Sequence, residues 1–290
     1  MTPLRKLWIT GLGIAGLALG LAALALFSAH TRPDPAHPAL WQVEGPGGQS
    51  AYLFGTIHTL PRPAAWRGPA VEQALANSDR IIVEIAQLND SARVFQSLAH
   101  TANLPPLDQR VRPDQRARLA AALAAIHRQP GDFTDTETWA AALMLAHDDG
   151  DPAHGVDRAL LADPAGKPIE EFEGAARQLA LFDRLPETAQ RRLLADAIAG
   201  EQTSPQALAQ AWRDGDITTI ARETSQGLLA DPTLREALYT GRNRAWAAQL
   251  IATMARGGHP FVAVGTAHLA GPDGLPVLLA ARGYRVRRLQ

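Results

Sequence analysis

The stretches YLFGTIH (residues 52–58) and FVAVGTAH (residues 261–268) end in the same Gly-Thr-x-His motif, although they lie near opposite ends of the chain. Each motif follows a short apolar run of the kind that forms a buried strand. In open α/β sheets, ligands bind beyond the carboxyl ends of the strands. The repeat therefore predicts that His58 and His268 lie at the rim of one sheet, where their imidazoles converge if the two halves of the chain lie side by side.

A third polar residue, Glu84, ends the apolar run IIVE (residues 81–84) and is expected at the same rim. Two histidines and one carboxylate can bind a divalent metal ion and leave positions open for water and substrate. Without a metal, Glu84 and one histidine can act as an acid–base pair. Glu84 also has purely structural interpretations, as a helix N-cap partner or as a salt-bridge partner of Arg80.

The order strand, Gly-Thr-x-His motif, helix, strand occurs at both ends of the chain, and the sequence between them is mostly helical. The runs LWQVE (residues 40–44) and SAYLFG (residues 50–55) flank a Gly-rich turn and predict a β-hairpin. We expect an α/β fold, with α+β as an alternative. N- and C-terminal βαβ-like halves should form a small central sheet around a large helical insertion.

Residues 7–27 form an uncharged apolar run behind Arg5 and Lys6. About 20 such residues can span a bilayer, whereas the core of a signal peptide is usually ~7–15 residues long. Because Phe27 stands where a cleavage site requires a small residue, we favour an uncleaved anchor over a cleaved signal. The predicted organisation is a signal peptide or signal-anchor over residues 1–29, a Pro-rich tether over residues 30–39 and one domain over residues 40–290.

This organisation predicts a protein of the cell envelope. It would be an inner-membrane protein with a periplasmic domain, or a periplasmic or secreted protein if the signal is cleaved. The chain of 290 residues has no cysteine, which excludes disulfides, thiolate metal sites and a cysteine nucleophile. Its formal net charge of −1 argues against a nucleic-acid partner. No P-loop, HExxH or GxSxG motif occurs, and the GxGxxG match at residues 11–16 lies inside the N-terminal apolar run, so we predict no organic cofactor.

The motifs stand in stretches that resemble the TraB/PrgY/GumN family, to which the Tiki proteins that cleave Wnt are related. The resemblance covers nearly everything from Leu40 onward, and the short, exported GumN-like proteins are the most similar in appearance. The matching stretches are LWQVEGPGGQSAYLFGTIH, IIVEI, GVDRAL, GKPIEEFEGAARQLALF, GRNRAW and FVAVGTAHLAGPDGLPVLLAARGYRV. The resemblance implies an α/β core shared with erythromycin-esterase-like and ChaN-like proteins. For the Tiki branch it implies metal-dependent proteolysis through the GxxH histidines and the Glu.

In this sequence, the histidines that match the family motif are His58 and His268, and the matching Glu is Glu84. The resemblance also singles out Arg242 and Glu173, which follows Phe where the family usually has Leu. The other recurrent motif positions are Asp157, Gln178 and Asn243. Glu173 and Asp157 have structural interpretations as helix caps, and Arg242 has one as a surface cation. We favour a functional Arg242, because a guanidinium suits an anionic substrate or a buried carboxylate.

The sequence therefore predicts an exported, membrane-tethered hydrolase, most specifically a metal-dependent peptidase. A divalent ion on His58, Glu84 and His268 would acidify a bound water. Glu84 or Glu173 would take the proton, and Arg242 would stabilise developing negative charge. The expected partners are a peptide or small signal ligand, and the membrane through the N-terminal helix. The alternatives are a non-catalytic envelope protein that binds a peptide, haem-like or signal ligand, and an accessory to polysaccharide export.

Overall fold

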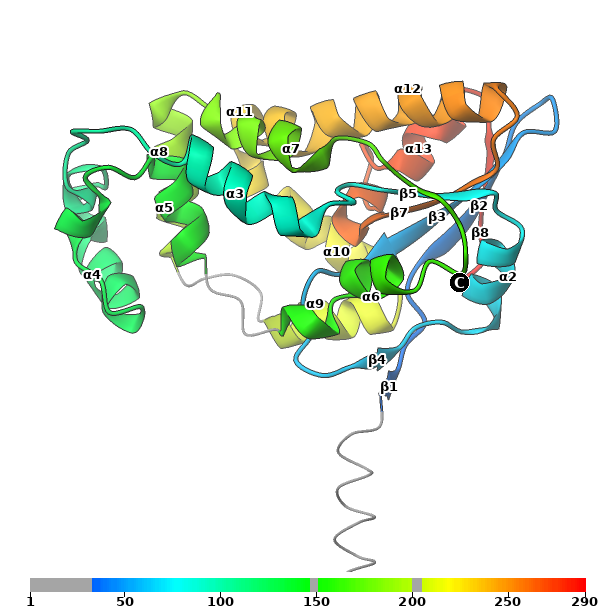
Figure 1. Ribbon diagram of the computed structural model, residues 1–290, viewed down its shortest axis with the longest axis horizontal. Helices are drawn as coiled ribbons and strands as arrows, with labels where there is room; N and C mark the ends of the chain where they lie inside the picture. The colour runs from blue at the N-terminus through cyan, green and yellow to red at the C-terminus, as the bar shows by residue number, and fades with distance from the viewer. Residues whose placement is uncertain (1–32, 147–150, 200–204) are drawn as a thin grey trace, which may run out of the picture.

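The computed structural model describes residues 33–146, 151–199 and 205–290 and contains a mixed sheet with strand order β6-β5-β7-β3-β2-β8 (Figure 1). The strands of this sheet are β2 (Leu40–Glu44), β3 (Ser50–Thr56), β5 (Arg80–Val83), β6 (Ile169–Glu171), β7 (Pro260–Gly265) and β8 (Arg285–Arg288). Strands β6, β5, β7 and β3 are mutually parallel. The predicted hairpin is present, since β2 pairs antiparallel with β3.

The prediction of a mixed α/β fold with a central sheet is confirmed. Strands from both ends of the chain enter this sheet, but β6 comes from the middle of the chain, within the region that we expected to be a helical insertion. The arrangement of the two halves differs from a simple side-by-side placement, because β7 lies between β3 and β5. Strand β7 is apolar and almost wholly buried, which suits the centre of a sheet. Strand β8 reads RVRR and is mostly exposed, so it occupies the outer edge beside β2.

Helices cover both faces of the sheet and also form a lobe beside it, which includes α4, α5 and α8 (Figure 1). The helices of the described residues are α2 (Pro69–Ala76), α3 (Leu88–Leu98), α4 (Arg116–Ala125), α5 (Thr138–Leu145), α6 (Val156–Ala162), α7 (Gly174–Asp183), α8 (Glu187–Ala197), α9 (Pro205–Arg213), α10 (Ile217–Ser225), α11 (Pro232–Arg235), α12 (Gly241–Ala255) and α13 (Leu275–Ala280). The helical lobe has a hydrophobic cluster of its own, which contains Trp139, Leu119 and Leu194.

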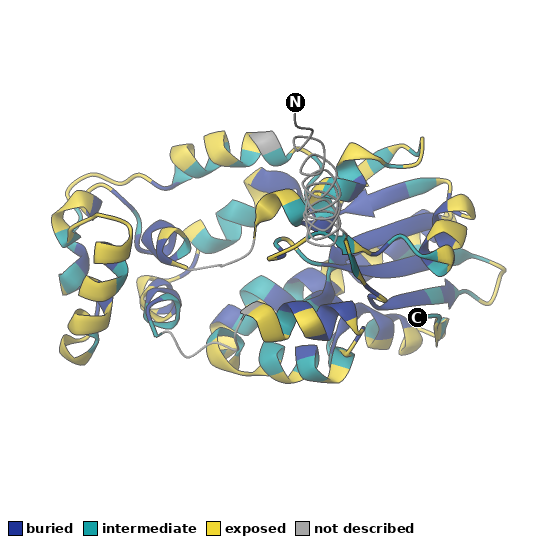
Figure 2. Cartoon of the chain, turned by 90° about the horizontal axis from the view of Figure 1, so that it is seen from below, coloured by how far each residue is buried: buried dark blue, intermediate teal, exposed yellow. Residues whose placement is uncertain are grey.

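The sheet has a hydrophobic cluster on each face, as the alternation of side chains along a strand requires. Tyr52 and Phe54 of β3 belong to one cluster, whereas Ala51 and Leu53 belong to the other. The central strands β3, β5 and β7 are accordingly dark blue, and many exposed residues lie on the outer faces of the helices (Figure 2). Because both faces are covered, polar side chains of the central strands can reach solvent only at the strand ends.

The predicted N-terminal anchor or signal lies outside the described residues. The part of the predicted tether that is described contacts the domain, since β1 (Asp34–Pro35) pairs with β4 (Ala64–Ala65). The Asp34 carboxylate also forms ion pairs with Arg62 and Arg213. Within residues 33–146, 151–199 and 205–290, no helix has the length and apolar character needed to cross a bilayer.

Candidate functional site

The two Gly-Thr-x-His motifs lie side by side, because β3 and β7 are parallel neighbours with Thr56 opposite Gly265. The Thr266 hydroxyl donates to the Thr56 carbonyl oxygen at 2.8 Å and so joins the two motifs. A Cβ at position 55 would lie 2.5 Å from Thr266 Oγ1, which explains why this position is Gly55. Gly55, Thr56 and Thr266 therefore hold the two strand ends together, and the histidines follow two residues after the threonines.

His58 forms an ion pair with Asp157 of α6, whose Oδ2 lies 2.8 Å from His58 Nδ1. The other carboxylate oxygen of Asp157 accepts a hydrogen bond of 2.6 Å from the Thr56 hydroxyl, so the aspartate is held on two sides. The Asp157 charge raises the pKa of His58 to about 9. The His58 side chain is 68% exposed, so solvent screens this pair and its contribution to stability is small.

Glu84 directly follows β5 and is 7% exposed. One carboxylate oxygen accepts the Gly265 N–H at 2.8 Å, and the other accepts Arg242 Nη2 at 2.7 Å. Burial opposes the charged form, but the charges of His268, Arg242 and His58 outweigh it and lower the pKa of Glu84 to about 2. Since His268 is neutral at pH 7, Arg242 is the main stabiliser of the carboxylate there.

Arg242 lies at the start of α12, is 8% exposed and binds two carboxylates. Its Nε donates to Glu173 at 3.1 Å, and its Nη2 lies 3.0 Å from Glu173 and 2.7 Å from Glu84. Its Nη1 is shared between the Leu238 carbonyl oxygen at 3.3 Å and His268 Nε2 at 3.1 Å. All five N–H groups of the guanidinium are thus engaged. In this arrangement Arg242 positions its neighbours and has no donor left for a substrate, in contrast to the charge-stabilising role that we expected.

The helix before Arg242 contains one π-helical turn over residues 236–240, between α11 and α12. Single π turns inside helices occur frequently at functional sites. A Cβ at position 241 would lie 2.7 Å from the Glu236 carbonyl oxygen, so the turn requires Gly241. The turn ends two residues before Arg242.

His268 is 7% exposed and lies in a short 3-10 turn after β7. Arginine only donates hydrogen bonds, so the contact with Arg242 makes Nε2 the acceptor and places the proton on Nδ1. That Nδ1–H donates to the Asn243 side-chain oxygen at 2.6 Å. Burial lowers the pKa of His268 to about 3, with Arg242 and His58 acting in the same direction and Glu84 against them. The imidazole is therefore neutral at physiological pH.

Glu173 follows β6 and stands at the N-cap position of α7, but its side chain makes no capping hydrogen bond. It accepts hydrogen bonds from Arg242 and, at 2.9 Å, from the indole N–H of Trp246. The Trp246 ring also packs against His268, with the ring centroids 4.5 Å apart. Glu173 is thus part of the same buried network and not a helix cap.

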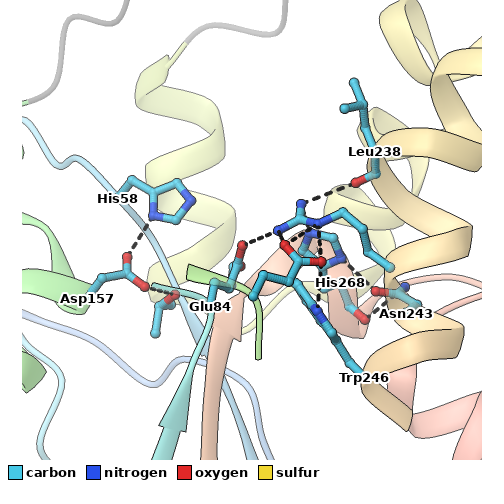
Figure 3. A network of polar contacts seen from close by, with 11 residues as sticks. His58, Glu84, Asp157, Leu238, Asn243, Trp246 and His268 are labelled. Carbon is cyan, nitrogen blue, oxygen red and sulfur yellow. Dashed lines mark hydrogen bonds and ion pairs between the residues drawn. The ribbon is translucent and has the colours of Figure 1, made fainter. Parts of the chain in front are cut away.

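The three residues predicted as metal ligands surround one point beside Gly265. A Cβ built at this glycine would lie 3.3 Å from Glu84 Oε1, 3.7 Å from His58 Nε2 and 4.0 Å from His268 Cδ2. Figure 3 shows Glu84 between His58 on one side and His268 on the other. The strand ends thus bring together the residues that the sequence singled out, although these lie 26 to 210 positions apart in the chain.

The donors at this point fit a metal ion only in part. Both histidines have Nδ1 held by an oxygen atom, which leaves each Nε2 as a ligand atom, as metal sites require. However, Arg242 already bonds to His268 Nε2 and to one oxygen of Glu84. Among the residues that the structure describes, no group of three or more His, Cys, Asp or Glu side chains is arranged to hold a metal ion. The predicted metal stays a prediction.

The sequence did not predict the two partners of the histidines. Asp157 lies in the first turn of α6, whose N-cap is Gly155, so it is not the cap of that helix. Asp157 and Asn243 were noted as motif positions, but Asp157 pairs with a histidine 99 residues away and Asn243 with one 25 residues away. Neither separation follows a helix or strand period, so only the fold brings these pairs together. The GVD and GRN stretches were the available signals, since each places a polar side chain at the start of a helix.

Two kinds of comparison with known proteins identify the same family. A model of the TraB/PrgY/gumN family matches residues 39–288. The chain is also 30% identical over 252 residues to the uncharacterized protein YbaP of Shigella flexneri, a match that covers 81% of this chain and 89% of that protein. YbaP of Escherichia coli K12 matches with the same identity and coverage. No solved structure matches the chain. The chain therefore belongs to the TraB/PrgY/gumN family.

Proposed function

We propose that this protein is a hydrolase that cleaves peptide-like amide bonds at the strand ends where His58 and Glu84 meet. The observation that carries the proposal is the orientation of His58. Asp157 holds Nδ1 at 2.8 Å, and Nε2 faces the point beside Gly265 that Glu84 also reaches. A histidine that a carboxylate orients through one ring nitrogen is suited to transfer a proton at the other.

In this proposal His58 is the residue that moves protons. Its raised pKa of about 9 makes the imidazolium the form present at neutral pH, so Nε2 can donate a proton to the departing amine. Water adds to the carbonyl carbon, the C–N bond breaks, and the proton that water loses returns to His58. Glu84, with a pKa of about 2 and both oxygens engaged, is a poor base and instead favours the protonated His58.

A metal-dependent form of the same reaction is the second candidate. It is supported by His58 Nε2, which faces the site, by the proximity of His268 and by the local charge. With His58 neutral, Asp157, Glu84, Glu173 and Arg242 leave an excess of two negative charges, which a divalent ion would neutralise. His58, Glu84 and His268 would hold the ion after Arg242 releases His268. A bound ion of this kind supplies an acidified water and a Lewis acid.

A peptide-cleavage assay tests these proposals. The full-length protein is treated with a chelator and incubated with a mixed peptide library, with and without added Mn²⁺, Co²⁺ or Zn²⁺. Cleavage in the chelated protein supports the metal-free form, and cleavage only after metal addition supports the second candidate. His58→Gln should abolish cleavage. The matched control is His259→Gln at the amino end of β7, an exposed histidine whose partner is Ser50. Retention of peptides without cleavage in every state would favour the non-catalytic alternative, namely a binding protein.

We further propose that the protein resides in the cell envelope, anchored in the inner membrane with the catalytic domain in the periplasm. The support is the apolar run over residues 7–27 behind two basic residues. Sequencing the N-terminus of the mature protein tests this location. An intact N-terminus in the membrane fraction is expected, whereas a chain that begins near residue 29 would replace the anchor with a cleaved signal.

A further inference from the structure

A cavity of about 280 Å³ opens beside the catalytic rim, and His58, Glu84 and Asp157 form part of its wall. Drug-sized ligands occupy pockets of roughly 300–1,000 Å³, so this cavity has room for one residue-sized group rather than for a long chain. A ligand that fills it lies directly against His58. The other residues of the cavity wall therefore determine which kind of ligand group can lie beside His58.

Most of that remaining wall is apolar. The apolar side chains come from the end of β5, the start of α3, the segment before α6, and α6 itself, and they are Val83, Ile85, Leu88, Pro152 and Leu161. An apolar wall favours an aliphatic or aromatic ligand group, because such a group leaves water on binding. A charged ligand group would lose its hydration there without gaining a partner.

One polar side chain interrupts the apolar wall without a partner of its own. Gln178 of α7 lines the cavity, and its side-chain oxygen is buried with no hydrogen bond. Buried acceptors are nearly always bonded, because an unsatisfied one is costly. A ligand N–H would satisfy this oxygen, so Gln178 indicates a donor on the ligand.

A cation also lines the cavity. Arg158 of α6 follows Asp157 directly, is exposed, and has no ion pair among the residues that the structure describes. Arg242 differs, since it binds two glutamates. An unpaired guanidinium suits a carboxylate on the ligand, which it can bind through two parallel hydrogen bonds.

We propose that this cavity recognises the C-terminal residue of a peptide, or an N-acylated amino acid, that carries an apolar side chain. The side chain fills the apolar wall, the amide N–H bonds to Gln178, and the free carboxylate pairs with Arg158. The carbonyl carbon of the same amide then lies toward His58. That this ligand is a substrate rests on the proposed hydrolase function. That it binds in the cavity is independent of that function.

Binding measurements on the full-length protein test the proposal. The probes are N-acetyl-leucine, its C-terminal amide, N-acetyl-glutamate, and the ester analogue of N-acetyl-leucine in which oxygen replaces the N–H. We expect N-acetyl-leucine to bind most tightly, by about fivefold over its amide, which is the upper range for an exposed ion pair. Arg158→Gln should remove the preference for the acid, and Gln178→Leu should remove the preference for the amide over the ester. The control is Arg177→Gln, an exposed arginine of α7 outside the cavity wall.

The outcomes separate this proposal from the proposed function. Equal binding of acid and amide by the unmodified protein, or a preference that survives Arg158→Gln, overturns the recognition of a carboxylate. Equal binding of N-acetyl-leucine and N-acetyl-glutamate overturns the apolar specificity. Selective binding without cleavage keeps the ligand class and refutes the hydrolase, whereas cleavage of library peptides without these preferences keeps the hydrolase and refutes the ligand class.

Discussion

Replacing Arg242 by methionine should destabilise the protein strongly, although Arg242 lies at a functional site. The Arg242 side chain is 9% exposed, and its positive charge balances the negative charges of Glu84 and Glu173, whose side chains are 8% and 12% exposed. Methionine has a similar length but no charge, so the substitution leaves two buried carboxylates without their cation. Removing one partner of a buried ion pair typically costs about 3–5 kcal/mol.

Urea denaturation at pH 7 measures this cost as a change in the free energy of unfolding. Thermal unfolding gives a second measurement. For a domain of this size, a loss of about 1 kcal/mol lowers the melting temperature by roughly 2–4 °C, so we expect Arg242→Met to melt about 6–20 °C lower. The control is Arg244→Met on the same helix, because Arg244 pairs with Glu236 and both side chains are more than half exposed. That substitution should cost less than about 1 kcal/mol.

The stability loss of Arg242→Met should depend on pH, because the charge of Glu84 causes part of it. In the unmodified protein Glu84 has its pKa lowered from 4.5 to about 2, so its stabilising contribution is present above pH 4.5 and is lost as the pH falls toward 2. Without Arg242 the folded-state pKa of Glu84 rises, so the deficit of Arg242→Met should shrink between pH 7 and pH 4. Adding Glu84→Gln and Glu173→Gln should recover most of the loss. A deficit below about 1 kcal/mol, or one that the glutamine substitutions leave unchanged, would refute the reasoning.

Three further predictions concern the residues around the paired motifs. In chelator-treated protein, NMR titration of His58 should give a pKa near 9 that falls toward 6.5 in Asp157→Asn; the stabilising effect of the pair is full below pH 6.5 and is lost as the pH rises through about 9. Gly55→Ala should cost about 1–3 kcal/mol in urea denaturation, because the new Cβ would lie 2.5 Å from Thr266 Oγ1. Gly265→Ala should destabilise the protein less than Gly55→Ala does but should lower the rate of peptide cleavage more, because its Cβ would occupy the point that His58 faces. A cleavage rate equal to that of the unmodified protein would contradict this role.

The parts of the fold that could be predicted are those with a local signal. The apolar runs of β3, β5 and β7 identified buried strands, and the Gly-rich turn identified the β2–β3 hairpin. The order of the strands had no such signal, because β7 lies between β3 and β5 in the sheet but begins 204 residues after the end of β3 and 177 residues after the end of β5. No pattern in the sequence indicated that β8 would pair with β2.

The candidate site divides in the same way. His58, Glu84 and His268 were accessible to prediction because each follows an apolar run, and parallel strands end at one rim. Their partners were not accessible as partners, since Asp157 and Asn243 reach the histidines from helices whose placement depends on tertiary packing. The full engagement of Arg242 also required the structure, because a guanidinium offers five donors and sequence alone does not show which of them remain free.

The fold gives a physical reason for two Gly-Thr-x-His motifs in one chain. Because β3 and β7 pair with Thr56 opposite Gly265, the glycines of the two motifs face different neighbours. Gly55 leaves room for the Thr266 side chain and so allows the strands to pack, whereas Gly265 leaves room at the point that His58 Nε2 and Glu84 Oε1 both approach. The glycine of the first motif therefore allows the strands to pack, whereas the glycine of the second motif leaves the site accessible. On this reasoning, adding one methyl group at each glycine should separate the stability of the sheet from the chemistry at its rim.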